Sequence, residues 1–454
     1  MSNNTANYRN AVLSGLIKTL DKGEKSHIVL GEILKNYSDR RDRTVIERIF
    51  KGTIERCITL DYVINKFSTT KVKKMKPVIR EILRMTAYQI IYMDGIEDYA
   101  ACNEAVKLTA KRGLLGLKGF VNAVLRKIVA SKDCIEYPDE NKEFDKYVSV
   151  KYSVPQWIIS SLISDYGKDK TIEILESLYD NESYVSVRVN VSKTDINSVK
   201  DSLKKEKVNA YDNFYADNAL KLKEINSITE LSSFKKGLIQ IQDVSSMLAI
   251  QATDIKPGDY VIDMCAAPGG KTCHILDKLN GKGMVSSRDI SQEKLELIKE
   301  NISRAGFKNV KLEKRDASVF YPEDENTADV IVCDVPCSGL GVIRRKPDIK
   351  YRLQKEDIDA LSELSKKIVD NAVKYLKPNG TLIFSTCTMT KKENDDIRDY
   401  IINECNLKPM DLTKKYSDTL IQEGENEEML KKGYLQLFLN KYHDGFYISK
   451  YKKT

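Results

Sequence analysis

Apolar residues recur every three or four positions through the first 130 residues of the chain. Three sets show this spacing most clearly: Ala11, Leu13, Leu16, Ile17 and Leu20; Val45, Ile46, Ile49, Ile54 and Ile58; and Ile79, Ile82, Leu83 and Met85. Such spacing places the apolar side chains on one face of a helix, and the alternation typical of strands is missing from the sequence here. The pattern therefore predicts an all-α bundle over residues 1–130.

The pattern changes twice after this bundle. Residues 133–148 are polar and acidic with weak periodicity, which indicates a linker over 131–150. After Pro155 the spacing is helical for a short stretch, and residues 183–190 then alternate between apolar and polar side chains as a half-buried strand does. We therefore expect a small α/β module over residues 151–235.

The last part of the chain, residues 236–454, alternates short β-prone runs with helical segments. The expected strands lie at residues 260–264, 284–287, 310–313, 330–333 and 381–385. Each of them ends at an acid, a glycine-rich turn or a cysteine. This alternation is typical of a doubly wound, mostly parallel α/β sheet, so the whole chain is expected to be a multidomain protein.

The net charge of +8 is concentrated at the N-terminus. Residues 1–130 hold 24 Lys and Arg against 13 Asp and Glu, whereas the remaining residues hold 50 against 53. A localised basic surface is typical of nucleic-acid binding, and the alternative is a set of solvated lysine-rich helices. Arg188, on the expected strand of the small module, is a candidate RNA contact, although a single strand arginine is more often a surface or salt-bridged residue.

The cysteines and histidines narrow the possible chemistry. The nine cysteines are scattered without a Cys-x-x-Cys pair, so reduced thiols are expected and a disulfide framework is not. The chain has only three histidines, too few to favour a histidine-based zinc site or a Ser-His-Asp triad, and no metal is expected. The N-terminus lacks a secretory signal pattern and no run of eighteen apolar residues occurs, so a cytoplasmic protein without a membrane span is expected.

The stretch at residues 334–341 reads Asp-Val-Pro-Cys-Ser-Gly-Leu-Gly and follows an apolar, β-prone run. It places an acid and a thiol at the carboxyl end of a strand, which is where open α/β sheets hold their reactive groups. On these residues alone Cys337 is the first candidate catalyst. The alternative is that Cys337 is a small packed residue, the commoner fate of a lone cysteine.

A second strand end indicates a nucleoside site. Its turn consists of Cys265, Ala266, Ala267, Pro268, Gly269, Gly270 and Lys271. Glycines allow a ligand to approach the backbone closely, yet the spacing matches neither a phosphate-binding loop nor a dinucleotide fingerprint. Asp289 is placed to accept from a ribose diol, and Asp316 to accept from an adenine amino group. A nucleoside without phosphates fits, namely S-adenosylmethionine; the alternative is that both acids cap helices.

Two groups of motifs resemble known families. Residues 77–92, 103–106 and 119–126 resemble the NusB fold, a helical RNA-binding module. The other group is similar to the motifs of the RNA 5-methylcytosine methyltransferases: residues 263–272, 334–341, 344–348 and 385–388, with Glu393 and Asn394. Taken together, the chain resembles the RsmB (Sun) family of 16S ribosomal RNA methyltransferases. The resemblance implies a NusB-like bundle, a small α/β RNA-binding module and a Rossmann-like methyltransferase domain that uses S-adenosylmethionine.

The resemblance also implies roles for single residues. C5 of cytosine is a poor nucleophile until a thiolate adds at C6, and covalent catalysis of this kind divides one difficult step into two. The family assigns the nucleophile to Cys387 and product release to Cys337. Asp334 would face both the cytosine edge and the methyl donor. The remaining implied contacts, with the RNA backbone, come from Arg344, Arg345 and Lys346, for which the alternative is a solvated charge run.

Three other functions stay open at this point. A transfer-RNA methyltransferase would carry much the same catalytic motifs. A non-catalytic RNA-binding or antitermination protein with a vestigial methyltransferase domain is disfavoured because both cysteines and the acids are present. A DNA 5-methylcytosine enzyme is disfavoured as well, since it would use the Pro-Cys thiol as nucleophile and would not need Cys387.

Overall fold

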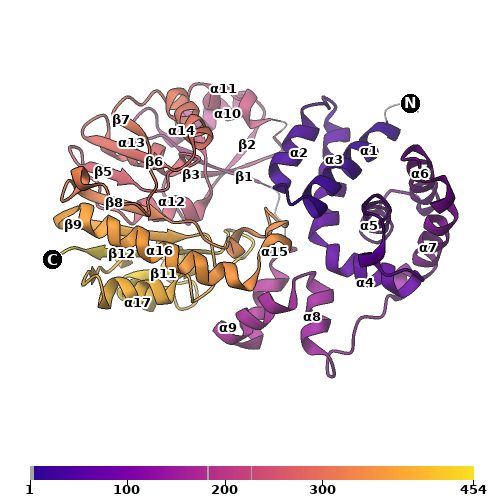
Figure 1. The fold of residues 1–454 in the computed structure, drawn as a ribbon. Helices are drawn as coiled ribbons and strands as arrows, with labels where there is room; N and C mark the ends of the chain where they lie inside the picture. Colours follow the sequence, from indigo (N-terminus) through magenta and orange to yellow (C-terminus); the bar gives the residue numbers. More distant parts are fainter. Residues whose placement is uncertain (1–4, 181–183, 226) are drawn as a thin grey trace. The chain divides into compact units, whose positions relative to one another are not determined.

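The structure, a computed structural model, describes residues 5–180, 184–225 and 227–454 (Figure 1). The chain divides into two compact units. The first, called the helical unit, comprises Met1–Tyr179 and Ile343–Leu353. The second, called the sheet unit, comprises Asp180–Val342 and Gln354–Thr454. Within the described ranges, no helix combines the length and the apolar character needed to cross a membrane.

The helical unit is all-α, as the apolar spacing predicted. Its helices are α1 (Thr5–Leu16), α2 (Ser26–Leu34), α3 (Arg40–Glu55), α4 (Cys57–Phe67), α5 (Pro77–Tyr92), α6 (Asp98–Lys111), α7 (Lys118–Ser131), α8 (Phe144–Tyr152), α9 (Gln156–Glu176) and α15 (Ile349–Arg352). Local signals set several of their starts. The Asp39 carboxylate accepts from the first backbone amides of α3, and Pro77 occupies the first position of α5.

Helix α5 is the centre of the helical unit. Ile82 and Leu83 are fully buried among apolar side chains from α1, α3, α4, α6 and α7. Burying each such side chain stabilises the fold by roughly 1.5–3 kcal/mol. Arg84 also points inward, and its charge is balanced by Asp61 at 2.6 Å and Glu81 at 2.7 Å. A buried arginine is tolerated here because two carboxylates take its hydrogen bonds.

Helices α8 and α9 lie on either side of the boundary expected at residue 150, and both pack within the helical unit. The stretch 131–150, expected to be a linker, contains most of α8, whose Val148 and Val150 are buried. Residues 151–179, expected to belong to the small module, pack with the helical unit. The weak periodicity of residues 133–148 hid helix α8, whereas the helix expected after Pro155 is present as α9. In α9 the helical backbone is also interrupted at Gly167 (φ 78°).

Residues 343–353 also belong to the helical unit. They were expected within a single domain over 236–454, yet this short segment packs into the helical unit. The Asp348 carboxylate accepts from the Ser26 hydroxyl, and the buried Lys350 ammonium donates to the Glu55 carbonyl at 2.9 Å. Tyr351 bonds the Ser153 carbonyl at 3.2 Å. The anchors are single polar contacts between distant residues, which no local sequence pattern reveals.

The sheet unit begins with a small antiparallel sheet. Its strands are β1 (Val185–Val189), β2 (Asn209–Asp212), β3 (Ala219–Lys223) and β4 (Ile239–Ile241), in the order β2-β3-β1-β4, beside helices α10 (Ile196–Lys205) and α11 (Ser232–Lys235). Val187 and Val189 of β1 pack with Leu203 of α10 and Leu220 of β3. The strand expected at 183–190 is therefore present over 185–189, and Ser183 lies outside the described residues.

The main sheet has eight strands. They are β5 (Tyr260–Asp263), β6 (Met284–Asp289), β7 (Val310–Lys314), β8 (Ala328–Asp334), β9 (Leu376–Thr386), β10 (Lys408–Pro409), β11 (Tyr434–Leu437) and β12 (Phe446–Lys452). The order is β10-β12-β9-β8-β5-β6-β7, with β11 beside β12. Strands β5 to β9 pair in parallel, so the mostly parallel Rossmann-like sheet is confirmed. The antiparallel strands after residue 404 were not predicted.

Both faces of this sheet are covered. The longer helices of the unit are α12 (Val244–Gln251), α13 (Gly270–Leu279), α14 (Gln292–Ala305), α16 (Lys355–Tyr375) and α17 (Asp395–Asn403), followed by the short α18 (Asp418–Ile421) and α19 (Asn426–Lys431). Along β8, Val330 and Val332 join one apolar core while Ile331 and Cys333 join the other. Parallel strands leave the sheet at one edge, so the acids and cysteines that follow them gather there.

Candidate active site

Two thiols meet at the carboxyl edge of the main sheet. Cys337 lies in the loop after β8, and Cys387 directly follows β9. The two strands are parallel neighbours, with Asp334 paired to Ser385. Their loops therefore leave the sheet side by side, and the two Sγ atoms lie 3.3 Å apart. Both cysteines are half-buried residues.

The surroundings of Cys337 favour its protonated form. The hydrogen bond with Cys387, burial, and the negative charges of Glu393 and Asp334 raise the pKa of Cys337 well above its usual value. A cysteine held as a thiol at neutral pH is a poor nucleophile, because the thiolate is the reactive species. The electrostatics therefore disfavour Cys337 as the attacking group, although its position alone first suggested that role.

Asp334, the last residue of β8, is fixed through both oxygens of its carboxylate. Oδ1 accepts from the Ser385 hydroxyl at 2.7 Å, and Oδ2 accepts from the Lys271 ammonium at 2.7 Å. Lys271 was expected among the cofactor contacts, and the ion pair gives it a second role that the sequence did not indicate. The two bonds fix the direction of the carboxylate at the strand end that leads to Cys337.

Gly341 joins the two cysteine loops through its backbone. Its amide donates to the Cys387 carbonyl at 3.0 Å, and its own carbonyl accepts from the Gly445 amide at 3.0 Å. A Cβ atom at this position would lie 2.0 Å from the Gly445 carbonyl oxygen. Glycine is therefore required by the close approach of three chain segments, and the motif ends in Gly for that reason.

Glu393 and Asn394, which precede α17, extend this network. The buried Glu393 carboxylate accepts from the Ser338 amide at 2.7 Å and the Ser338 hydroxyl at 2.6 Å. The Asn394 amide accepts from the Thr386 hydroxyl at 2.6 Å. The sequence motif included both residues but gave no role for either.

The turn expected to bind the cofactor connects β5 to α13. Gly269 has φ 100°, a conformation that favours glycine, and a Cβ there would lie 3.1 Å from the Ile298 Cα. Gly270 begins α13, so backbone amides of the first helical turn face outward from the sheet edge. Cys265 is half-buried, Ala266 is buried, and Ala267 and Pro268 complete the turn. This is an open backbone cradle at the carboxyl end of β5.

Asp289 lies beside that turn, at the end of β6. Its carboxylate accepts from the Ala267 amide and from the Ser291 amide, both at 3.3 Å, and pairs with Lys294 at 3.2 Å. Ser291, and not Asp289, caps helix α14. The long bonds leave acceptor capacity on a buried carboxylate, which suits a diol donor. The helix-cap alternative therefore does not describe Asp289.

Asp263 and Asp316 complete the acidic residues of this edge. Asp263 is fully buried at the end of β5; Oδ2 accepts from Thr272 at 2.7 Å, and Oδ1 has no partner among the described residues. Burial raises the pKa of Asp263 to about 7. The Asp316 carboxylate accepts from the amide and the hydroxyl of Ser318, at 2.9 and 2.7 Å. These bonds form a local turn, in which Asp316 bonds the backbone two residues on as a helix-capping acid does.

These residues fit S-adenosylmethionine as a bound group. The glycine turn allows close approach, and the Asp289 carboxylate, whose present hydrogen bonds are long, has acceptor capacity for a hydroxyl donor. Asp334 stands at the adjoining strand end. Among the described residues, no cluster of three or more His, Cys, Asp or Glu side chains could hold a metal ion. None of the nine cysteines is in a disulfide.

Arg188 requires a correction. It was expected to contact RNA, but its side chain is 1% exposed and its guanidinium pairs with Asp277 at 2.7 Å. Asn190 and Gln242 accept its other hydrogen bonds, at 2.6 and 3.1 Å. The salt-bridged alternative therefore holds, because a buried carboxylate on α13 takes the charge. Arg188 joins the small sheet to α13 and is not available to a ligand.

We expect Arg188→Ala to destabilise the sheet unit by about 3–5 kcal/mol, because Asp277 would be left buried without a counter-charge. The urea midpoint of unfolding measures the effect. The exposed Lys193→Ala is the control and should change the free energy of unfolding by less than about 0.5 kcal/mol. An Arg188→Ala variant as stable as this control would contradict the structural role.

The basic run after the cysteine loop lies on the helical unit. Arg345 and Lys346 are exposed, and Arg344 is half-buried. Burial and the positive charges of Lys346 and Lys25 lower the pKa of His27, which shows that α2 begins beside these cations. An RNA contact by the run remains a prediction.

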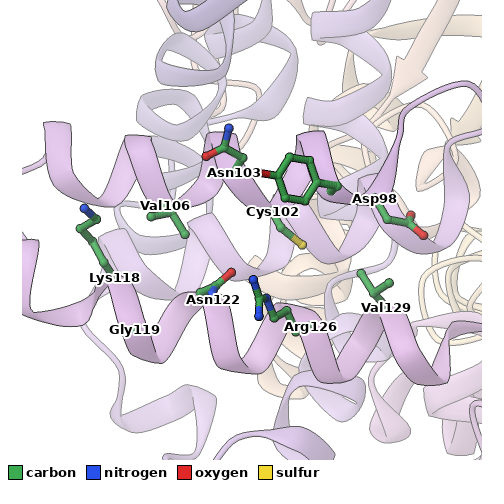
Figure 2. Close-up of a pocket in the computed structure, with 10 residues that line it drawn as sticks. Asp98, Cys102, Asn103, Val106, Lys118, Gly119, Asn122, Arg126 and Val129 are labelled. Atoms are coloured by element: carbon green, nitrogen blue, oxygen red, sulfur yellow. The ribbon is translucent and has the colours of Figure 1, made fainter.

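A groove of about 450 Å³ lies between α6 and α7 of the helical unit (Figure 2). Its lining includes residues from the NusB-like stretches at 103–106 and 119–126: Asn103, Val106, Gly119, Asn122 and Arg126. In Figure 2, Asn122 and Arg126 point from α7 towards α6. Their side chains make no hydrogen bond with another described residue, so polar donors are available to a ligand.

The fold and the site together define an S-adenosylmethionine-dependent methyltransferase with a NusB-like helical N-terminal domain. Residues 250–452 match the family model described as 16S rRNA methyltransferase RsmB/F. Residues 6–130 match the NusB family, and residues 154–229 match the ferredoxin-like domain of RsmF/B-like methyltransferases. The chain belongs to the RsmB/F methyltransferase family.

Individual relatives agree with this assignment. The probable ribosomal RNA small subunit methyltransferase B of Bacillus subtilis is 35% identical over 402 residues, covering 87% of this chain and 88% of the relative. The ribosomal RNA small subunit methyltransferase B of Proteus mirabilis is 28% identical, covering 86% and 89%. A solved methyltransferase homolog from Pyrococcus horikoshii is 25% identical with a TM-score of 0.58, covering 68% of this chain and 98% of that one.

Proposed function

We propose that this protein transfers a methyl group from S-adenosylmethionine to C5 of a cytosine in 16S ribosomal RNA, through a covalent bond between Cys387 and C6. The observation that carries the proposal is the pair of thiols 3.3 Å apart on neighbouring strand ends beside Asp334. The names of the relatives support the ribosomal substrate, since they are small-subunit ribosomal RNA methyltransferases.

The proposed cycle begins at Cys387. Its thiolate forms a bond to C6, and the electron pair displaced from the ring makes C5 nucleophilic. S-adenosylmethionine, when bound, supplies an electrophilic methyl group. A base then removes the C5 proton, the C5–C6 double bond forms again, and the S–C6 bond breaks to return the thiolate. One difficult substitution is thereby divided into addition and elimination.

Asp334 and Cys337 take the other roles. Asp334, held by Lys271 and Ser385, is directed to hydrogen-bond the N3/N4 edge of the cytosine and so to stabilise the adduct. Cys337 assists elimination after methyl transfer. Its raised pKa suits this role, because Cys337 stays a thiol and can donate a hydrogen bond to the Cys387 sulfur as the S–C6 bond breaks and that sulfur gains negative charge.

The substrate base must leave any helix to reach the thiols, so we infer a single-stranded or flipped cytosine. The groove between α6 and α7 offers Asn122 and Arg126 as RNA contacts on the helical unit. Arg344, Arg345 and Lys346 add cations on the same unit for the RNA backbone. Both sets agree with the basic surplus of the first 130 residues.

Methyl transfer from labelled S-adenosylmethionine to unmodified 16S RNA tests the function. We expect label in 16S RNA, and bisulfite sequencing should place it at a single cytosine. Parallel reactions with unmodified transfer RNA test the alternative substrate, and label there alone would move the assignment to transfer RNA. No incorporation into either RNA would favour a binding-only protein.

Replacing Arg345 and Lys346 with alanine should weaken RNA binding without changing which cytosine is methylated, because phosphate contacts carry no sequence information. The slope of log affinity against log salt should fall by about 0.7–0.9 for each phosphate that is no longer neutralised. Filter binding across a salt series measures this slope. Lys146→Ala, which removes an exposed lysine of the same unit, should leave it unchanged. An unaltered slope in the double variant would show that Arg345 and Lys346 do not contact RNA phosphates.

A further inference from the structure

Glu393 is a buried carboxylate that connects three segments around the thiols. Its side chain is 1% exposed. Oε1 accepts from the Ser338 amide at 2.7 Å, and Oε2 accepts from the hydroxyls of Ser338 at 2.6 Å and Thr390 at 2.7 Å. Ser338 directly follows Cys337 in the chain. One carboxylate therefore fixes the backbone and the side chain of the neighbour of one thiol.

The same network reaches the neighbours of the other thiol. Thr388, the residue after Cys387, lies 2.7 Å from the Ser338 hydroxyl and 3.4 Å from Oε2 of Glu393. On the opposite side, the Thr386 hydroxyl donates to Asn394 at 2.6 Å, and Asn394 donates to the Thr388 carbonyl at 3.2 Å. Both neighbours of Cys387 are thus held by consecutive residues, Glu393 and Asn394.

We propose that Glu393 is the positioning residue of this active site: it holds the loops of Cys337 and Cys387 so that the two thiols stay in contact. The inference rests on the proposed roles of these cysteines. Glu393 bonds the residue that follows Cys337 and lies within 3.4 Å of the hydroxyl of the residue that follows Cys387. It acts through Ser338 and Thr388, which are adjacent in sequence to the thiols.

The chemistry of the site explains why an acid is used. Three donor groups converge on the Glu393 carboxylate: the Ser338 amide and the hydroxyls of Ser338 and Thr390, while the Thr388 hydroxyl donates to the Ser338 oxygen. Only a carboxylate has acceptor capacity for all of them. A hydrogen bond to a charged acceptor is also stronger than one between neutral groups. Removing the acid would leave buried donors without partners and release both loops.

Position matters here because both thiols act on one ring. In the proposed cycle the base must meet Cys387 at C6, while Cys337 assists at the stage of elimination. A displacement of about 1 Å between reacting groups can lower a rate about 10²-fold. A residue that sets the separation of the thiols therefore affects turnover without contacting the RNA.

A dithiol reagent measures the thiol separation independently of methylation. Phenylarsine oxide bonds two nearby thiols through arsenic and releases one water, so its affinity depends on how close the second thiol is held. We expect Glu393→Ala to weaken this binding about tenfold, because the effective concentration of the second thiol falls. Glu393→Gln, which keeps the Oε1 acceptor, should fall between wild type and alanine. Cys337→Ala defines binding at other cysteines.

Kinetics give the second readout. Glu393→Ala should lower the single-turnover methylation rate about 10²-fold while KM for RNA stays within about threefold. Asp396→Asn, three residues further along, removes an exposed ion pair with Lys392 and should change neither readout. Circular dichroism and the urea midpoint establish whether each variant is folded. If Glu393→Ala is not folded, the arsenical affinity and the methylation rate of Glu393→Gln test the positioning role instead.

Two results would overturn the inference. The first is wild-type arsenical affinity in a folded Glu393 variant, which would show that the thiols stay together without the carboxylate. The second is a loss confined to KM for RNA, which would make Glu393 a binding residue. An inactive wild-type protein would contradict the proposed function alone, because the arsenical measurement needs no RNA.

Discussion

Replacing Cys387 with alanine is expected to abolish methyl transfer, lowering the single-turnover rate about 10⁴-fold or more. The physical reason is that C5 of cytosine cannot attack a methyl sulfonium at a useful rate unless a thiolate has first added at C6. Asp334 and the cofactor turn would remain intact, so binding of S-adenosylmethionine should be unchanged. Labelled methyl incorporation into 16S RNA measures the rate, and calorimetry measures cofactor binding.

The matched control for this experiment is Cys405→Ala. Cys405 is another partly exposed thiol of the sheet unit, but its Sγ faces Asp370 at 3.8 Å. Its loss should leave turnover near the wild-type value. Normal turnover by Cys387→Ala would contradict the proposed mechanism, because no other thiol in contact with Cys337 is found among the described residues.

Replacing Cys337 with alanine should block a later step of the cycle than replacing Cys387. We expect addition at C6 and methyl transfer to proceed while elimination fails, so that a covalent protein–RNA complex accumulates. On a denaturing gel this complex should rise from undetectable in wild type to a major fraction of the enzyme. The reason is that the group beside Cys387 that assists the final step has been removed.

The double variant Cys337→Ala/Cys387→Ala controls for non-specific crosslinking and should give no complex. The covalent bond also predicts which peptide carries the RNA: mass spectrometry should find the nucleotide on Cys387. A complex that persists in the double variant would place the bond elsewhere. If Cys337→Ala turned over normally, elimination would need no second thiol, and the contact at 3.3 Å would have another purpose.

The raised pKa of Cys337 connects these two experiments. Asp334 and Glu393 surround it with negative charge, and the hydrogen bond with Cys387 adds to their effect. Burial adds to these causes, and together they favour the protonated form of Cys337. The division of labour that the family resemblance implied has a physical basis in this arrangement, although the roles themselves await the experiments.

Much of the fold could be predicted from the sequence because its signals are local. Helical spacing of apolar residues is a property of neighbouring positions, and it correctly identified the bundle around α5. Strand ends were visible as β-prone runs that stop at Asp263, Asp289, Asp334 or Cys387. Since the carboxyl ends of parallel strands meet at one edge, the sequence also predicted that these groups would lie close together.

The sequence could not predict interactions that depend on residues far apart in the chain. Arg188 has the same local appearance whether it faces RNA or a carboxylate, and only the packing of α13 places Asp277 against it. Lys271 was expected to contact the cofactor, and only the fold shows that its ammonium group also pairs with Asp334, at 2.7 Å. Burial creates such pairs, because a charge removed from water must find a partner.

By itself, then, the sequence determined the family of the protein and its fold class, and it singled out residues 334–341 and Cys387 as candidates for the catalytic chemistry. The tertiary structure alone decided that residues 343–353 belong to the helical unit, and that Glu393 connects the neighbours of both thiols. The physical reason is the range of the interaction. Periodicity and turn chemistry act over a few residues, whereas hydrogen bonds between buried groups depend on the completed fold.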